Sequence, residues 1–271
     1  MKVKRNILIA LTLLDTILLA QEFPLGIRSQ ALGGAAVAQG REAEALFENP
    51  ALLANLTGLT FTAFYSHPFG LKELRLGSLS GSASWQNLAL GAAVVDFGNE
   101  LYRDRRYHAV IARQLLPQQR LALGVSGAMR HLRITGYGDD SAITLNLGMQ
   151  LRLSEALTLG SAFTNLLDAT LGNQKEKLPR SACFGFAYFP ASTLTLQADL
   201  YKQNNFSEEW RIGIEANPWP PLLLRTGIGT NPDRLTFGLA LRVLKLSLQF
   251  AAFSHTDLGW TEQFAVTLHS Q

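Results

Sequence analysis

Charged and amide side chains recur at alternate positions inside segments that are otherwise apolar. They are Arg130, Gln150, Arg152, Asp199, Arg211, Glu215, Arg225 and Arg242. An unpaired charge is costly to bury in a protein core, so such residues need water or a partner of opposite charge. We expect all eight to line a polar lumen. Guanidinium and carboxylate groups pair well, and we expect Asp199 and Glu215 to form an ion-pair ladder with Arg211 and Arg225.

Residues that carry out catalysis or bind metal ions are not grouped in the chain. The five histidines are scattered, and Cys183 is the single cysteine. No Gly-x-Ser-x-Gly elbow, phosphate loop or dinucleotide fingerprint is present. We predict no enzyme activity, catalytic residue, metal site or cofactor. The net charge of +3 is small and the basic residues form no stripe, so nucleic acid is not an expected partner.

The elements that position these polar residues are predicted to be β-strands. From residue 141 to residue 153 the odd positions are large and apolar, and the even positions are polar or glycine. Successive side chains of a strand point to opposite faces, so this segment has one apolar face and one polar face. The same pattern recurs at 57–66, 72–84, 87–97, 103–115, 119–132, 141–153, 155–166, 180–189, 192–202, 208–216, 221–229, 233–243, 244–254 and 259–269.

These fourteen segments predict an all-β fold, an antiparallel transmembrane β-barrel over residues 57–271. Many are long enough to cross a bilayer at a tilt, and their polar faces carry charges that the core of a soluble β-sandwich would not accept. Short turns alternate with longer connections such as 97–104, 133–140 and 167–179, the asymmetry of an outer-membrane barrel. Proline occurs only in the predicted connections. We expect an outer-membrane location with lipid around the barrel.

Two segments precede the predicted barrel. Residues 1–20 have basic residues, an apolar run and a small residue at the end, as in a secretory signal peptide; the alternative is a membrane anchor. Residues 21–56 do not alternate and are rich in small residues. We expect a helical turn before Asn49 and a second short helix after it, with Asn49 as its cap and Pro50 at its first position.

Glycines recur on the polar face of the strands. They are Gly124, Gly148, Gly160, Gly185, Gly213, Gly227 and Gly238. Two interpretations stay open: another backbone approaches the wall closely there, or the glycines relieve strain where the sheet bends.

The N-terminal segment resembles a known family. Leu32-Gly33-Gly34-Ala35, followed by the run from Glu44 through Asn49-Pro50-Ala51 to Leu53, is similar to the N-terminal hatch of FadL-type outer-membrane proteins. That family includes long-chain fatty-acid transporters and PorV/PorQ-like proteins linked to type IX secretion. The resemblance implies a fourteen-stranded barrel plugged by residues 21–56. The plug contacts it implies are Leu32, Gly33, Gly34, Asn49, Pro50, Ala51 and Leu52.

Two functions follow from these expectations. The first is a transporter or channel for a small hydrophobic solute, in which the plug shifts and solute passes through the lumen or a lateral gap. The alternative is a non-transporting, PorV/PorQ-like structural component with secretion-system proteins as partners. The polar character of the longest outer connection favours that alternative.

Overall fold

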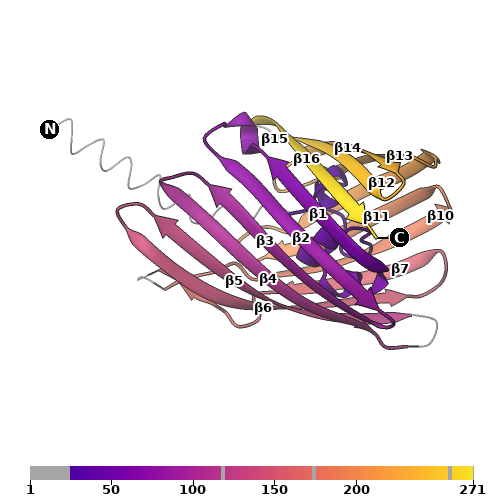
Figure 1. Cartoon of the computed structure of the whole chain (residues 1–271), viewed down its shortest axis with the longest axis horizontal. Coiled ribbons are helices and arrows are strands. Elements are labelled where there is room, and N and C mark those ends of the chain that lie inside the picture. The colour runs from indigo at the N-terminus through magenta and orange to yellow at the C-terminus, as the bar shows by residue number, and fades with distance from the viewer. Residues whose placement is uncertain (1–24, 117–119, 173–174, 256–257, 271) are drawn as a thin grey trace.

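The chain forms a closed antiparallel barrel of fourteen strands (Figure 1). The computed structural model describes residues 25–116, 120–172, 175–255 and 258–270. The predicted signal peptide at 1–20 lies outside these residues. Each barrel strand pairs with its sequence neighbour in the barrel, and β1 pairs with β16 to close the ring.

The strands occupy the predicted segments. Their bounds are β1 Gly58–Ser66, β2 Arg75–Trp85, β3 Leu88–Gly98, β4 Tyr102–Gln114, β5 Leu121–Ile134, β6 Gly138–Arg152, β7 Leu157–Thr164, β10 Ser181–Ala191, β11 Leu194–Gln203, β12 Glu209–Trp219, β13 Leu222–Gly229, β14 Arg234–Val243, β15 Leu246–His255 and β16 Gly259–His269. A small hairpin, β8 Thr170–Leu171 with β9 Glu176–Lys177, lies in the connection between β7 and β10. The predicted fourteen-stranded barrel is confirmed.

Three expectations about the connections were wrong. The loops expected at 97–104 and 133–140 are tight, because β4 begins at Tyr102 and β6 begins at Gly138. Their residues are polar on both faces, so alternation does not distinguish these strand ends from loops. Proline also enters two strands, Pro190 in β10 and Pro218 in β12. Both lie where the register shifts, at an irregularity that can tolerate the missing N–H of proline.

The two ends of the barrel differ. At one end, here called the turn end, several connections between consecutive strands are only two residues long. They are 86–87, 192–193, 220–221 and 244–245. At the other, the loop end, the helix η3 (Pro68–Gly70) and the β8–β9 hairpin lengthen the connections. The barrel chain starts and finishes at the turn end, where Thr60 of β1 pairs with His269 of β16.

The outer face of the barrel is apolar. Large side chains exposed there come from every part of the ring, among them Phe61, Leu79, Ile143, Phe184, Ile212, Phe237 and Phe264. In β6 the odd residues point outward and Ala142 and Gly148 point inward, as the alternation predicts. A contiguous apolar surface of this extent is typical of a membrane-facing wall. Among the described residues, no helix is long and apolar enough to span a membrane.

Residues 25–56, here called the inner segment, lie within the barrel (Figure 1). The segment contains the helices α2 (Ile27–Ala31), η1 (Ala43–Phe47) and η2 (Pro50–Asn55). The side chain of Asn49 accepts a hydrogen bond from the Ala51 N–H at the start of η2, so the predicted cap is confirmed. Helix α2 contacts β13–β16, whereas η2 contacts β2–β6 across the lumen.

Candidate functional site

The inner segment rests on glycines of the barrel wall. A Cβ added at Gly213 would lie 2.7 Å from the Leu32 Cβ, and one added at Gly227 would lie 2.6 Å from the Leu32 carbonyl oxygen. Neither position accepts a side chain unless the backbone moves. Four more lumen-facing glycines meet the inner segment in the same way: Gly124, Gly148, Gly160 and Gly238. Close approach of a second backbone therefore accounts for these six, while Gly185 meets Asp199 of the neighbouring strand.

Asn49 joins the inner segment to itself and to the wall. Its Nδ2 donates to the carbonyl oxygens of Val37, at 2.7 Å, and of Met149 in β6, at 3.0 Å. The side chain is fully buried, and its Oδ1 caps η2. One amide thus satisfies three backbone groups that are remote from water, which requires an asparagine rather than a carboxylate. Gly148 makes room for it.

Gln150 makes a second polar contact on β6. It donates to the Ala38 carbonyl oxygen at 2.8 Å and accepts from Nδ2 of Asn55 at 2.7 Å. Asn55 in turn accepts from Gln114 of β4 at 2.7 Å. The inner segment is therefore bonded to β6 at Ala38, and to both β4 and β6 at Asn55.

Asp199 receives the N–H groups of a turn in the inner segment. One carboxylate oxygen accepts from Ala36 at 2.8 Å and from Val37 at 2.9 Å. Two backbone donors that would be unpaired in the lumen are satisfied in this way.

A buried ion network centres on Glu215 of β12. Glu215 accepts from Arg28 of the inner segment at 3.1 Å and from Arg225 of β13 at 2.7 Å. Arg225 also lies 3.6 Å from Glu42, which is 3.5 Å from Arg242 of β14. Because positive and negative charges alternate along these contacts, removing one partner would leave an uncompensated buried charge.

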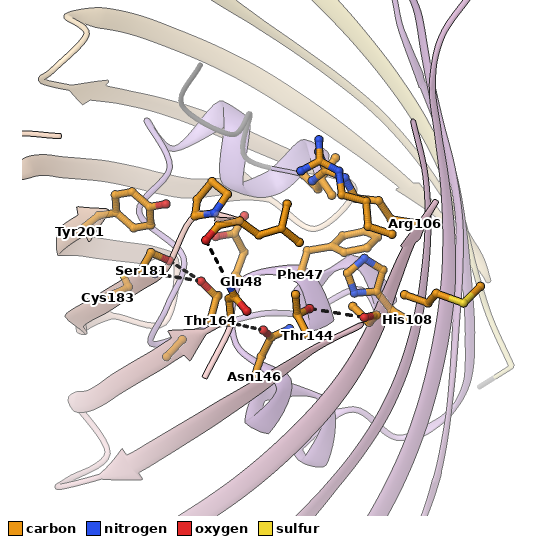
Figure 2. A pocket seen from close by; sticks show the side chains of 18 of the residues that line it. Phe47, Glu48, Arg106, His108, Thr144, Asn146, Thr164, Ser181, Cys183 and Tyr201 are labelled. Atoms are coloured by element: carbon orange, nitrogen blue, oxygen red, sulfur yellow. Dashed lines mark hydrogen bonds between the residues drawn. The ribbon is translucent and has the colours of Figure 1, made fainter. Parts of the chain in front are cut away.

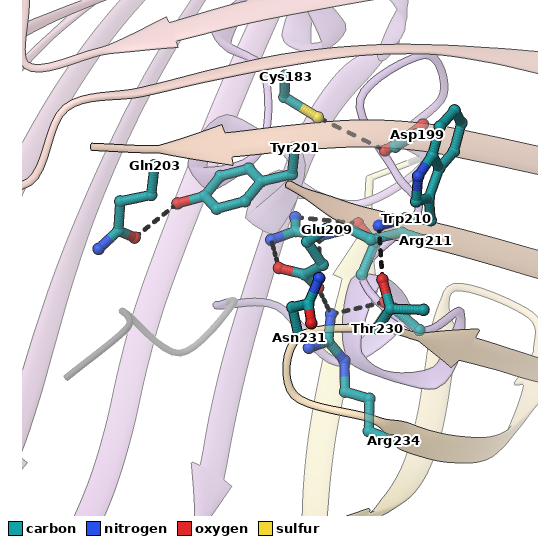
Figure 3. A network of polar contacts seen from close by, with 12 residues as sticks. Cys183, Asp199, Tyr201, Gln203, Glu209, Trp210, Arg211, Thr230, Asn231 and Arg234 are labelled. Atoms are coloured by element: carbon teal, nitrogen blue, oxygen red, sulfur yellow. Dashed lines mark hydrogen bonds and ion pairs between the residues drawn. The ribbon is translucent and has the colours of Figure 1, made fainter. Parts of the chain in front are cut away.

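A second network lies nearer the loop end (Figure 3). Glu209 accepts two hydrogen bonds from Arg211, both at 2.9 Å, and also pairs with Arg234. Arg234 donates to the Gly33 carbonyl oxygen at 2.8 Å, and Arg211 stacks over the ring of Tyr201 at 3.9 Å. The predicted plug residues Gly33 and Gly34 thus bond to wall arginines, Gly33 to Arg234 and Gly34 to Arg211.

Not every predicted lumen residue lies against the inner segment. Arg130 pairs with Asp104 of β4 at 2.8 Å, and Arg106 pairs with the same carboxylate at 3.0 Å. Arg152 is the exposed last residue of β6, at the turn end. Several charged partners were not predicted as site residues, among them Arg28, Glu42, Glu44, Asp104, Arg106, Glu209 and Arg234. The inward phase of Asp104 and Glu209 on their strands was the signal that could have identified those two.

A cavity of about 150 Å³ lies beside the inner segment, toward the loop end (Figure 2). Leu25, Phe47 and Glu48 of the inner segment form one side of it, and His108 and Tyr201 come from the wall. The rings of Phe47 and His108 meet edge to face, with 5.2 Å between their centroids. The cavity therefore combines aromatic surfaces with charged groups, because Arg106, Arg130 and Arg211 line it together with Glu48.

Two carboxyl groups of the inner segment have unusual proton affinity. Burial raises the pKa of Glu44 to about 8, although its carboxylate accepts the Ile27 N–H at 2.9 Å. Burial also raises the pKa of Glu48 to about 7, with Arg211 opposing that shift. Charging either group therefore weighs against the packed position of the inner segment.

The barrel wall has a short seam beside the cavity. β6 runs from Gly138 to Arg152, but β7 pairs only with its half from Leu147 onward. Beyond that point the connection between β7 and β10 covers β6: Leu166 donates its N–H to the Leu145 carbonyl oxygen at 2.9 Å. Asn165 donates its N–H to the Asn146 side chain, also at 2.9 Å. Asn146 and Asn165 both line the cavity, so a loop rather than a paired strand closes this part of the wall.

No metal-binding constellation occurs among the described residues, where no three histidine, cysteine or acidic side chains come together. Cys183 is buried, with its sulfur 3.9 Å from the carboxylate of Asp199.

The same architecture occurs in solved structures. The Ralstonia pickettii toluene transporter TbuX aligns over 90% of this chain and 97% of its own, with a TM-score of 0.64 and 13% identity. The Pseudomonas putida toluene transporter TodX aligns over 92% of this chain and 98% of its own, with a TM-score of 0.64 and 15% identity. A Pseudomonas aeruginosa FadL homologue aligns over 91% of this chain and 99% of its own, with a TM-score of 0.62 and 10% identity. The chain has the FadL-type fold. The resemblance inferred from the sequence is confirmed for this fold, although no family model and no curated protein matches the sequence.

Proposed function

We propose that the protein is an outer-membrane channel for a small hydrophobic solute and that the inner segment is its plug. The observation that carries this proposal is the cavity between Phe47 of the inner segment and the wall residues His108 and Tyr201. Small-molecule sites are concave spaces that combine apolar or aromatic surfaces with a few polar groups, and this cavity has both kinds of lining. We infer that residues 1–20 direct export and that an enzymatic role is absent.

The size of the cavity suggests the class of solute. A space of about 150 Å³ matches an engineered protein cavity that binds benzene, so one aromatic ring fits. TbuX and TodX, which share this fold, are toluene transporters. This likeness favours transport over the secretion-associated alternative.

We infer that the plug is held by two kinds of contact. In the first kind, uncharged residues of the segment pack on wall glycines or form hydrogen bonds to the wall. They are Leu32, Gly33, Asn49 and Pro50, and the helix η2 continues with Ala51 and Leu52. In the second kind, charged wall residues pair with charged residues of the segment: Glu215 with Arg28, and Arg225 and Arg242 with Glu42. Gly34 also lies against Arg211. The lumen-lining residues that we propose hold the plug are Gln150, Asp199, Arg211, Glu215, Arg225 and Arg242, whereas Arg130 and Arg152 line the lumen away from it.

We infer a route from the loop end into the cavity and out through the seam between β6 and β7. The seam is closed by Asn146, Asn165 and backbone hydrogen bonds of the covering loop, which can open without breaking a strand pair. A solute leaving there would enter the hydrocarbon directly. Passage beneath the plug would require the buried ion networks to separate, which is far more costly.

Filling the cavity tests the proposal. Ala128 lines it from β5, so Ala128→Phe should lower the rate of toluene uptake into proteoliposomes by about tenfold. The matched control is Ala109→Phe, because Ala109 is exposed on the neighbouring strand and pairs with Gly127. Uptake by the control should equal that of the unaltered protein. Equal uptake by Ala128→Phe, or no uptake by the unaltered protein above empty liposomes, would overturn the proposal.

A further inference from the structure

We propose that an outward-facing basic patch at the loop end of β2–β5 binds the phosphorylated headgroup of an outer-leaflet lipid. The patch, here called the rim patch, consists of Arg75, Arg103, Arg105 and Arg133, with Asp96 and His131 between them. The proposal rests on the proposed function only in placing the barrel in an outer membrane. It does not depend on what the lumen transports.

Strand register brings the rim patch together. In the row nearest the loop end, Arg103 of β4 pairs with Arg133 of β5, and Gly98 of β3 separates Arg103 from Arg75 of β2. In the next row, Asp96, Arg105 and His131 are register partners on β3, β4 and β5. All of these residues share the outward phase of their strands.

The third row is apolar. It consists of Leu79, Val94, Tyr107, Met129 and Ile143, which are register partners across β2–β6. Two residues along a strand correspond to about 7 Å, so the basic rows begin within about 7 Å of the apolar surface. In outer-membrane barrels the longer loops face outward, so we place the loop end at the outer leaflet, where lipid phosphates lie just outside the hydrocarbon core.

The charges of the rim patch are only partly balanced within the chain. Asp96 accepts from Arg103 at 2.8 Å and from Arg105 at 2.9 Å, so one carboxylate orients two guanidinium groups. Asp139 is the register partner of Arg133, and it is exposed. Arg75 and Arg133 form no ion pair with any residue in the described part of the chain.

Like charges placed directly opposite each other on neighbouring strands destabilise a sheet. Arg103 and Arg133 are such a pair, and an anion between them would turn repulsion into attraction. Guanidinium groups bind phosphate oxygens with paired hydrogen bonds, and Arg103 and Arg105 remain exposed by 49% and 42%. The chemistry is therefore that of a phosphate-binding surface.

The opposite wall carries different residues at the same end. Trp210, Leu235 and Trp260 are exposed on β12, β14 and β16, where an aromatic belt meets the interface. Arg180 and Lys202, at the loop end of β10 and β11, pair with Asp168 and Glu208, so the arginines that lack an ion pair at this end of the described chain, Arg75 and Arg133, belong to a local patch. Its position, directly above lipid-facing side chains, favours a lipid headgroup over a soluble anion as the occupant.

Native mass spectrometry tests the proposal on the detergent-solubilised full chain, with diphosphoryl lipid A as the probe. We expect the unaltered protein to retain this lipid and the double variant Arg103→Ala, Arg133→Ala to bind it about tenfold more weakly. The control is Arg113→Ala with Arg120→Ala, since both are exposed near the turn end and Arg113 shares the outward phase of β4. The control should bind like the unaltered protein. Heat-modifiable migration on gels verifies that each variant is folded.

The alternatives give different results. Equal retention of lipid A by the double variant, or equal retention of dephosphorylated lipid, overturns the proposal. Displacement by millimolar inorganic phosphate alone would identify a site for free phosphate and also overturns it. Toluene uptake, measured in liposomes that contain no lipid A, reports separately on the proposed function.

Discussion

At the scale of single residues, the wall glycines are the most demanding feature of the lumen. We predict that Gly227→Ala destabilises the folded protein by about 1–3 kcal/mol, because its Cβ would overlap the Leu32 backbone. The matched control is Gly127→Ala, since nothing lies within 4 Å of a Cβ added at Gly127. Urea unfolding of both variants measures the difference.

The control should be unchanged or slightly stabilised, because alanine restricts the unfolded chain more than glycine does. Equal stability of the two variants would show that the inner segment does not press on the wall in the folded protein.

Asn49 supports a second prediction at this scale. Asn49→Ala leaves the carbonyl oxygens of Val37 and Met149 without their donor and should cost about 1–3 kcal/mol. Limited proteolysis within residues 25–56 should become faster as the segment separates from the wall. Asn204→Ala, at an exposed position between β11 and β12, is the control. Unchanged proteolysis of Asn49→Ala would contradict the anchoring role.

The sequence identified residue types in the lumen better than residue pairs. The phase of each strand indicated that Asp199, Arg211, Glu215 and Arg225 face inward. It did not indicate that Glu215 pairs with Arg28, because that contact depends on how the ring closes around the inner segment. Alternation reports the face of a side chain and contains no information on its partner across the lumen.

At the scale of elements, the inner segment should respond to pH. A carboxyl group with a raised pKa favours the packed state at low pH, and that contribution is lost as pH rises through the raised pKa. For Glu48 and Glu44 the loss begins above the ordinary carboxyl pKa and is complete above about pH 7 and about pH 8. We predict that toluene uptake is several-fold faster at pH 9 than at pH 6, measured in proteoliposomes buffered equally on both sides.

Substituting both carboxyl groups tests the cause. Glu44→Gln with Glu48→Gln should abolish the pH dependence while preserving uptake at pH 6, since glutamine resembles the protonated group. Glu73→Gln, on the exposed connection between β1 and β2, should retain the full dependence. A pH dependence that persists in the double variant would assign it to other groups.

Elements were predictable where hydrophobic alternation is strong. All barrel strands occupy their predicted segments, and the cap of η2 was evident from Asn49-Pro50. The loop-end extensions of β4–β6 and the β8–β9 hairpin were not predicted. Outside the hydrocarbon both faces of a strand are polar, so the period-two signal that identifies a strand disappears.

At the scale of the whole molecule, barrel closure and the inner segment are separable. Every barrel strand is paired on both sides, and no strand of the ring comes from residues 25–56. We predict that deleting residues 25–56 leaves a heat-modifiable barrel with an open lumen. Planar-bilayer recordings should show a larger single-channel conductance than for the full chain.

The deletion also removes partners of buried charges, which water would then solvate. Circular dichroism distinguishes an open barrel from an unfolded chain, because the β-sheet signal persists only in the former. A folded deletion variant with unchanged conductance would show that the inner segment does not obstruct the lumen.

The placement of α2 against β13–β16 and of η2 against β2–β6 has a mechanical consequence. The inner segment spans the lumen like a strut, and a strut resists flattening of the ring along its own direction. Flexing is then easiest where a loop instead of a paired strand closes the wall, along the part of β6 that β7 does not reach. A solute that displaces the strut would alter the cross-section of the ring, and the seam would respond at a distance from the point of contact.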